Sequence, residues 1–261
     1  MKRLIIVTIT VFCIGISNSY AWGELGHRIV VEIAKRHLTE KTKENLAKYM
    51  PYDITQDAVW MDKHRFDKEI KYTNDWHVYN LDEKYEYDMN PRLHKGGDAI
   101  YALRVVDHNL LKQERLTDSA IVMNIRCLLH FAGDMHCPAH TYPAKVHCFW
   151  PCTLNGVKYK FFHTVYDLMP DLLFPNMSCT EVATLIDNAK RGEIKRIQKG
   201  EPIDWVKRDI GEPNSEIYKW NKFLAPDLNP NTAELSRELI TMQLRNAGYR
   251  LAYLLNKYFG K

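Results

Sequence analysis

The chain has 261 residues, of which 46% are hydrophobic and 26% charged. This length accommodates one or two domains, and the composition excludes a disordered chain, a collagen-like repeat and a protein with many membrane spans. The formal net charge is only +4, which is weakly basic for a protein that binds nucleic acid through its phosphates alone. The 11 histidines are the unusual feature, and we expect the function to depend on them.

The first 21 residues have the pattern of a secretory signal peptide. A basic start at residues 1–3 precedes an apolar run over residues 4–14, which is too short to span a bilayer. Ser19 and Ala21 then place small side chains at the −3 and −1 positions of a cleavage site. We expect export to the periplasm or the extracellular space without stable membrane insertion, and a mature chain that begins at Trp22.

Beyond the signal peptide, apolar residues recur with helical periodicity and strand-like alternation is scarce. The pattern predicts an all-α fold, a single compact helical domain over residues 22–261 without repeats or linkers. The predicted helices cover residues 27–50, 98–116, 118–135, 161–169, 179–199 and 231–258. Thr39 is the predicted N-cap of a restart within the first helix, and Gly260 ends the last one. Residues 145–162 are predicted to form irregular loops or a hairpin.

The densest group of candidate metal ligands lies between His130 and His140. If the helix continues through Asp134, His130 and Asp134 lie one turn apart on the same face. Pro138 then ends the helix, and His140 returns from the following turn. Imidazole nitrogens and carboxylate oxygens are the donors expected of an open, catalytic zinc site.

His163 and Asp167 repeat the same spacing downstream. One such pair on a helix is more often a surface pair or a cap, but two pairs and His140 within 38 residues favour a metal centre. The set exceeds what one zinc ion can use. Several ions that share a bridging carboxylate are the simplest arrangement, with Asp134 at the centre.

Three further segments supply candidates. Asp62 precedes Arg65 in one tryptophan-containing segment, and His77 follows a tryptophan in another. Each of these alone fits a buried aromatic beside a polar surface residue. The free amine and carbonyl of Trp22 could chelate a metal together with His27, although the alternative is an ordinary chain start.

Taken together, these motifs resemble the zinc-dependent single-strand nuclease family (the S-one/P-one, type I or mung-bean-type nucleases). The resemblance spans residues 22 to 256 and rests on Trp22–His27, Trp60–Arg65, Trp76–Tyr79, His130–His140, His163–Asp167 and Ala247–Asn256. It implies a compact, mostly helical secreted enzyme with three zinc ions, similar in fold to zinc phospholipase C.

The resemblance also implies a role for each site residue. The three zinc ions would divide nine residues, with Asp62, His77, His130 and Asp134 on the first, His140, His163 and Asp167 on the second, and Trp22, His27 and a second oxygen of Asp134 on the third. Arg65 would offset charge in the transition state, and Asp82 would orient the attacking water. His136 is not a ligand in the family, and we expect it to be buried and hydrogen-bonded.

The implied reaction is hydrolysis of single-stranded DNA and RNA to 5′-phosphorylated products, with 3′-nucleotidase activity, by a zinc-bound hydroxide that attacks phosphorus in line. The implied enzyme is a monomer that needs no protein partner. The family's Gly-Gly-Asn segment is absent here, which leaves base recognition open. The aromatic residues that could stack a base, or belong to the core instead, are Phe149, Trp150, Phe161 and Phe162.

Two rival classes remain. A zinc-dependent phospholipase C shares the N-terminal Trp and the central motif, but its last ligand is Glu where this chain has Asp167. An exported, non-catalytic zinc-binding protein would have closed coordination without Arg65 nearby.

The cysteines are consistent with export without proving it. The mature chain holds five of them, Cys127, Cys137, Cys148, Cys152 and Cys179, so at least one thiol is free. Cys148 and Cys152 could close a short loop through a disulfide bond, and Cys137 could be a buried free thiol beside the zinc motif.

Overall fold

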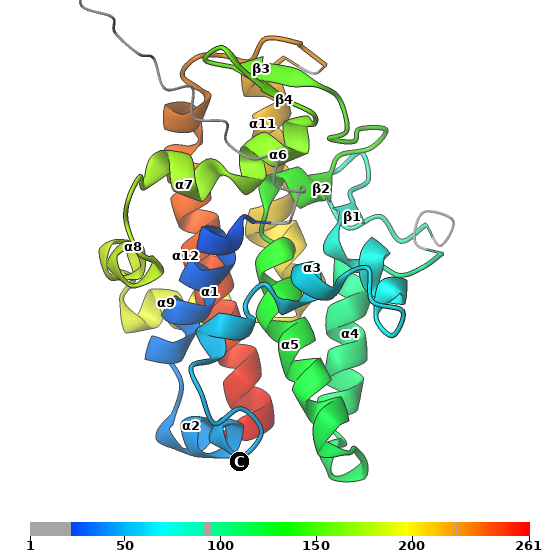
Figure 1. Cartoon of the computed structure of the whole chain (residues 1–261), viewed down its shortest axis with the longest axis vertical. Coiled ribbons are helices and arrows are strands. Elements are labelled where there is room, and N and C mark those ends of the chain that lie inside the picture. Colours follow the sequence, from blue (N-terminus) through cyan, green and yellow to red (C-terminus); the bar gives the residue numbers. More distant parts are fainter. Residues whose placement is uncertain (1–21, 91–94, 223) are drawn as a thin grey trace, which may run out of the picture.

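The computed structural model describes residues 22–90, 95–222 and 224–261, so the predicted signal peptide lies outside the described residues. Helices dominate the described chain and its strands are short, which confirms the all-α prediction (Figure 1). The α-helices are α1 (Glu24–Arg36), α2 (Glu40–Ala47), α3 (Trp60–His64), α4 (Ala99–Leu110), α5 (Asp118–Asp134), α6 (Phe162–Asp167), α7 (Met169–Leu173), α8 (Cys179–Ile186), α9 (Arg191–Gln198), α10 (Pro202–Trp205), α11 (Gly211–Trp220) and α12 (Thr232–Phe259). Short 3-10 helices are η1 (Ile54–Asp57), η2 (Lys71–His77), η3 (Gln113–Arg115) and η4 (Pro138–His140), and a π-helix covers Val206–Ile210.

Side-chain caps explain why several helices begin where they do. Thr39, Asp98, Thr117 and Ser178 each accept a hydrogen bond from a backbone N–H of the first turn of α2, α4, α5 and α8. Such a cap satisfies one of the N–H groups that a helix start leaves unpaired. The predicted restart at Thr39 is confirmed.

The long helix α12 lies at the centre of the helical packing, with α1 packed along it and the α4–α5 pair beside them (Figure 1). A Cβ atom at Gly248 of α12 would clash with the side chain of Ile33 on α1, so glycine permits the close approach of these two helices. This packing positions α1, which carries His27.

Two small sheets complete the fold. β1 (Tyr79–Asn80) pairs in parallel with β2 (Thr141–Tyr142), and β3 (Cys152–Leu154) forms an antiparallel hairpin with β4 (Val157–Tyr159). The hairpin confirms the prediction for residues 145–162. Asn155 and Gly156 form its two-residue turn with positive φ angles of 51° and 79°, as a type I′ turn requires.

The predicted helix over residues 179–199 is wrong in one respect, because the chain breaks between α8 and α9. Asp187 leaves the helical conformation there (ψ 70°), and its Oδ1 accepts hydrogen bonds from Tyr249 at 2.8 Å and His37 at 2.9 Å. These contacts come from distant parts of the sequence. They outweigh the local helical pattern.

All five cysteines in the described residues are free, so the expected Cys148–Cys152 disulfide bond is not present. The Cys148 sulfur instead lies 2.7 Å from the Tyr218 hydroxyl, and Cys152 is held in β3. Among the described helices, none has the length and apolar character needed to cross a membrane.

Candidate metal centre

The C-terminal end of α5 presents His130 and Asp134 on one face, as their spacing predicts. His130 Nε2 lies 3.2 Å from Asp134 Oδ2. His130 Nδ1 lies 2.9 Å from the carbonyl oxygen of Ala58, and since a carbonyl only accepts, Nδ1 carries the proton and Nε2 faces the cluster. Such an outer hydrogen bond typically fixes the tautomer of a metal-binding histidine.

The expectation that Pro138 ends α5 is wrong in detail. The helix already ends at Asp134, and Pro138 is the first residue of η4. The residue before a proline is disfavoured in helical conformation, and Cys137 is accordingly extended, with ψ 124°. The short turn of η4 then brings His140 back toward the end of α5.

Four donor atoms from three elements surround one point beside α5. Asp62 comes from α3, and His77 is the last residue of η2. His77 Nδ1 lies 2.9 Å from Asp134 Oδ2, 3.2 Å from His130 Nε2 and 3.7 Å from Asp62 Oδ1. Asp62 Oδ1 is 3.6 Å from His130 Nε2. Two ligands of a tetrahedral zinc ion are about 3.3 Å apart for bonds of about 2.0–2.1 Å, so these separations fit one ion.

A second group of donors combines η4 and α6. His163 Nε2 lies 2.8 Å from His140 Nε2 and 3.3 Å from Asp167 Oδ1. The His140 ring is oriented by a hydrogen bond from its Nδ1 to the carbonyl oxygen of His77, at 2.7 Å. β1 begins two residues after His77 and β2 directly follows His140, so the pairing of these strands holds the two histidines side by side.

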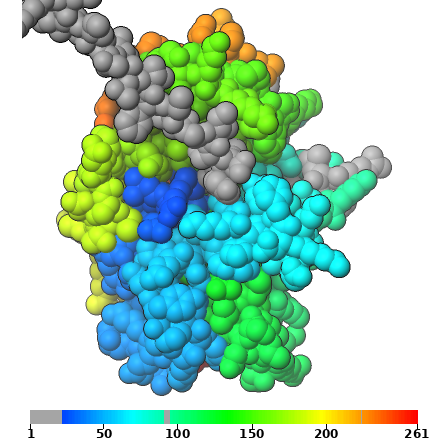
Figure 2. Space-filling model, viewed as in Figure 1, coloured from blue at the N-terminus to red at the C-terminus, as the bar shows by residue number. Residues whose placement is uncertain are grey.

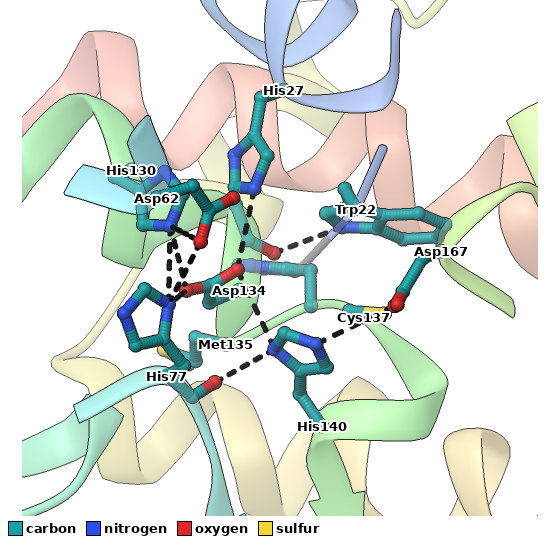
Figure 3. Close-up of polar contacts among 12 residues, drawn as sticks. Trp22, His27, Asp62, His77, His130, Asp134, Met135, Cys137, His140 and Asp167 are labelled. Carbon is teal, nitrogen blue, oxygen red and sulfur yellow. Dashed lines mark hydrogen bonds and ion pairs between the residues drawn. The ribbon is translucent and has the colours of Figure 1, made fainter. Parts of the chain in front are cut away.

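Asp134 lies between the groups (Figure 3). While its Oδ2 faces His77 and His130, its Oδ1 lies 3.4 Å from His27 Nε2 and 3.4 Å from His140 Nδ1. One carboxylate therefore contacts four imidazoles that come from α1, η2, α5 and η4.

The N-terminal end of α1 is fitted tightly against this cluster. The Trp22 indole is buried and donates to the carbonyl oxygen of Gly133 at 2.9 Å, and the Gly23 N–H donates to the carbonyl oxygen of Asp167 at 2.7 Å. A Cβ atom at Gly133 would lie 2.9 Å from His27 Nδ1. Because Ala21 precedes Trp22 in the full chain, the backbone nitrogen of Trp22 is an amide here. It becomes an amine only if the bond between Ala21 and Trp22 is cleaved.

Burial and mutual charge set the protonation of the cluster. Burial opposes the negative charge of Asp134, but His130 and His140 outweigh it and hold the pKa of Asp134 well below its usual range. Burial lowers the pKa of His140 to about 4, and burial together with the His140 charge lowers that of His163. The carboxylate is therefore ionised and both imidazoles are neutral, as metal coordination requires.

His130 behaves in the opposite way. Burial lowers its pKa, but the charges of Asp134 and Asp62 outweigh burial and raise the pKa well above 6.5. A metal ion would take the place of this proton between the two carboxylates.

Unsatisfied polar atoms also indicate a ligand site. Both ring nitrogens of His27 and both carboxylate oxygens of Asp62 are buried without a hydrogen bond, as is Oδ1 of Asp134. Buried polar atoms in folded proteins almost always have a hydrogen-bond partner or a ligand. The donor set, its spacing and these atoms fit metal ions.

The two residues expected to assist catalysis lie close to the ligands in sequence. Arg65 follows Asp62 by three positions at the end of α3 and is partly buried, with its guanidinium 5.6 Å from the centre of the Phe66 ring. Asp82 holds a local turn, where its Oδ1 accepts from the N–H groups of Lys84 at 2.8 Å and Glu86 at 3.0 Å.

Only part of the expected aromatic surface is available for stacking. Trp150 and Phe162 are buried against each other, with ring centres 4.5 Å apart, which favours the core alternative for these two residues. Phe149 is 51% exposed and lies parallel to the His163 ring at 5.7 Å. Phe161 is partly buried and meets Phe149 edge-on at 5.6 Å.

His136 is buried and hydrogen-bonded, as expected. Its Nδ1 donates to the carbonyl oxygen of Ala132 at 2.8 Å, and its Nε2 accepts from the Arg250 guanidinium at 2.8 Å. Arg250 in turn pairs with Asp209 at 2.6 Å. Arg250 had no predicted role, although the predicted burial of His136 called for a hydrogen-bond partner.

Comparison with known proteins identifies a hydrolase that acts on phosphodiester bonds. The family model described as S1/P1 Nuclease matches residues 22–260. The chain belongs to this nuclease family, whose substrates are nucleic acids, and the resemblance drawn from the sequence is confirmed.

The curated relatives share the whole length of the chain. Endonuclease 2 of Arabidopsis thaliana is 24% identical, and the match covers 99% of this chain and 98% of that protein. Nuclease P1 of Penicillium citrinum is 22% identical, with 92% of this chain and 98% of that protein covered. The similarity to these nucleases therefore extends over nearly the whole chain.

Proposed function

We propose that this chain is an exported three-zinc nuclease that hydrolyses single-stranded DNA and RNA to 5′-phosphorylated products and also acts as a 3′-nucleotidase. The signal peptide over residues 1–21 is removed, and residues 22–261 form the single catalytic domain. The observation that carries this proposal is the position of Asp134 between the histidines of several donor groups. Asp134 and the histidines around it would together hold more than one ion, and such ions would supply the Lewis-acid chemistry of phosphoester hydrolysis.

The proposed ligands follow the donor groups. The first zinc takes the four donors around Asp134 Oδ2, and the second takes His140, His163 and Asp167. The third takes His27, Asp134 Oδ1 and the amine and carbonyl of Trp22. Zinc is the favoured ion because mixed imidazole and carboxylate donors at tetrahedral separations suit it, whereas magnesium and calcium prefer all-oxygen sites.

The residues divide the catalytic work. Zinc, when bound, lowers the pKa of water and polarises the phosphoryl group. Arg65 neutralises the negative charge that develops on the phosphoryl oxygens, and Asp82 orients the attacking water. Burial of Asp134 and its partners excludes bulk water, which strengthens each of these electrostatic interactions.

The exposed ring of Phe149 is the proposed contact for a nucleobase. Its ring lies nearly parallel to that of His163, with the ring centres 5.7 Å apart, so a base stacked on Phe149 holds the adjoining phosphate near the second zinc ligand group. Base stacking on an aromatic side chain contributes about 1–3 kcal/mol and tolerates any base. A single strand can present its bases in this way, whereas a duplex keeps them stacked inside.

The test uses residues 22–261 reconstituted with zinc and given single-stranded DNA, single-stranded RNA, duplex DNA, 3′-AMP and phosphatidylcholine vesicles. We expect cleavage of both single strands with 5′-phosphate ends, release of phosphate from 3′-AMP and much slower cleavage of the duplex. Asp134→Asn abolishes these activities, and the control Asp67→Asn, at an exposed carboxylate, retains them. Hydrolysis of lipid alone, or zinc binding without any turnover, would contradict the proposal.

A further inference from the structure

We propose that the thiol of Cys137 is an additional ligand of the ion held by His140 and Asp167. This inference rests on the metal binding proposed above and extends it to a residue that the family resemblance leaves unassigned. The ligand atoms of Cys137, His140 and Asp167 all lie within 4.8 Å of one another, and all three residues are buried. Figure 3 shows the Cys137 sulfur beside the Asp167 carboxylate.

The backbone holds Cys137 and His140 in a fixed relation. The Cys137 N–H donates to the carbonyl oxygen of Asp134 at 3.0 Å, and the Cys137 carbonyl accepts from the His140 N–H at 3.0 Å and from the Thr141 hydroxyl at 3.2 Å. These backbone contacts fix Cys137 relative to His140, and the ligand atoms of the two side chains lie within 4.8 Å of each other.

The donor chemistry favours a metal ligand. His140 Nδ1 donates its proton to the His77 carbonyl oxygen, so the lone pair of His140 Nε2 can bind a metal ion. His140 Nε2 lies 3.7 Å from Asp167 Oδ1. Thiolate sulfur is among the ligands that zinc binds most readily in proteins. On binding, the thiol proton passes to solvent as the sulfur–zinc bond forms.

The thiolate changes the character of this site. His140, His163 and Asp167 alone leave one position of a tetrahedral ion open, whereas the sulfur would fill it, and four protein ligands are typical of closed sites. We therefore expect this ion to be the last removed by a chelator. The ions around Asp134 keep the open positions that substrate requires.

The simplest alternative is a thiol that only donates a hydrogen bond to the Asp167 carboxylate. X-ray absorption at the zinc edge separates the two, because sulfur lies about 2.3 Å from zinc and nitrogen or oxygen about 2.0–2.1 Å. For wild-type residues 22–261 loaded with zinc, we expect about one sulfur for every three zinc ions. Cobalt-loaded protein should show a thiolate-to-cobalt charge-transfer band in the near ultraviolet.

Cys127 is the matched control, because it is a second buried cysteine and lies outside the candidate metal groups of the described residues. Cys137→Ser should lose the sulfur shell and the charge-transfer band, and Cys127→Ser should keep both. Circular dichroism checks that each variant folds, and the wild-type spectrum alone decides the question if one does not. Bound zinc without a sulfur shell, or sulfur that persists in Cys137→Ser, overturns this inference and leaves the nuclease proposal standing. A protein that takes up no zinc refutes both.

Discussion

Replacing Asp134 by Asn removes one negative charge from the centre of the cluster while keeping the size of the side chain. Oδ2 lies 2.9 Å and 3.2 Å from the nitrogens of His77 and His130, and Oδ1 lies 3.4 Å from those of His27 and His140. Whichever way the new amide turns, its NH₂ group faces a proposed metal-binding nitrogen, that of His77 or His130 on one side and that of His27 on the other. The substitution therefore acts on every ion that Asp134 bridges.

The size of the effect follows from the number of donor groups that each carboxylate contacts. Loss of an outer-sphere partner alone typically costs about 10–100-fold in metal affinity, so loss of a direct ligand costs more. We expect Asp134→Asn to retain about one zinc ion of three, and Asp167→Asn, which alters one group, to retain about two. The rate constant of Asp134→Asn should fall at least about a thousandfold, which corresponds to about 4 kcal/mol in the activation barrier.

The assay measures zinc per protein by mass spectrometry at a fixed free zinc concentration, alongside the rate of single-strand cleavage. Asp67→Asn serves as the control, because Asp67 is exposed and pairs with His64 outside the cluster. Equal zinc content in Asp134→Asn and the wild type would refute the bridging role of Asp134. A larger loss of zinc in Asp167→Asn than in Asp134→Asn would refute it too.

Three further predictions concern the chain start, a glycine and pH. A single residue added before Trp22 replaces the amine by an amide, which binds metal poorly, so zinc content should fall by about one ion and single-strand cleavage should slow in a rate assay. Gly133→Ala should displace His27, whose ring nitrogen lies 2.9 Å from the added Cβ, and zinc content should fall. The control is Gly192→Ala in α9, where an added Cβ has no neighbour within 4 Å. This control should raise the free energy of unfolding by about 0.5–1 kcal/mol. Without metal, the folded state holds His140 neutral with a pKa of about 4, below the ordinary value of 6.5, so the unfolded chain binds more protons. The contribution of His140 to stability is complete above pH 6.5, is lost as the pH falls toward 4, and changes by about 2 kcal/mol between pH 7 and pH 5. Because burial also lowers the pKa values of His27, His136 and His163, urea unfolding in EDTA should show at least this loss of stability at pH 5.

Each of these three predictions would be contradicted by a specific result. Unchanged zinc content in the extended chain would remove the amine from the ligand set. Gly133→Ala with wild-type zinc content would mean that His27 does not bind metal, and destabilisation by Gly192→Ala would remove it as a control. Stability that does not fall between pH 7 and pH 5 would mean that the buried histidines with lowered pKa values, His140 among them, are not neutral in the folded protein.

The parts of the site that depend on local geometry could be predicted from the sequence. The spacing of four residues sufficed to place His130 beside Asp134 and His163 beside Asp167, because a helix brings such residues together on one face. The caps at Thr39 and Gly260 also follow from local signals. Periodicity could not show that α3 and η2 bring their ligands to α5, and that expectation came only from the resemblance of the motifs.

The predictions that needed tertiary information were the ones that failed or were missing. The stack of Trp150 on Phe162 depends on the packing of the hairpin segment against α6. The residues that flank either ring in the sequence do not reveal this packing. Residues 202–220 were not predicted to be helical, and they contain a π-helix in which Asp209 is non-helical. Asp209 is held there by Arg250 of α12, a contact between segments 41 residues apart.

The central claim is that Asp134 and its neighbours hold several zinc ions. The most direct test is anomalous diffraction at the zinc edge from crystals of residues 22–261 grown with zinc. We predict one peak among Asp62, His77 and His130, a second beside His163, and a third between the Trp22 amine and His27. A map with no peak beside Asp134, or with zinc only at the protein surface, would contradict this account.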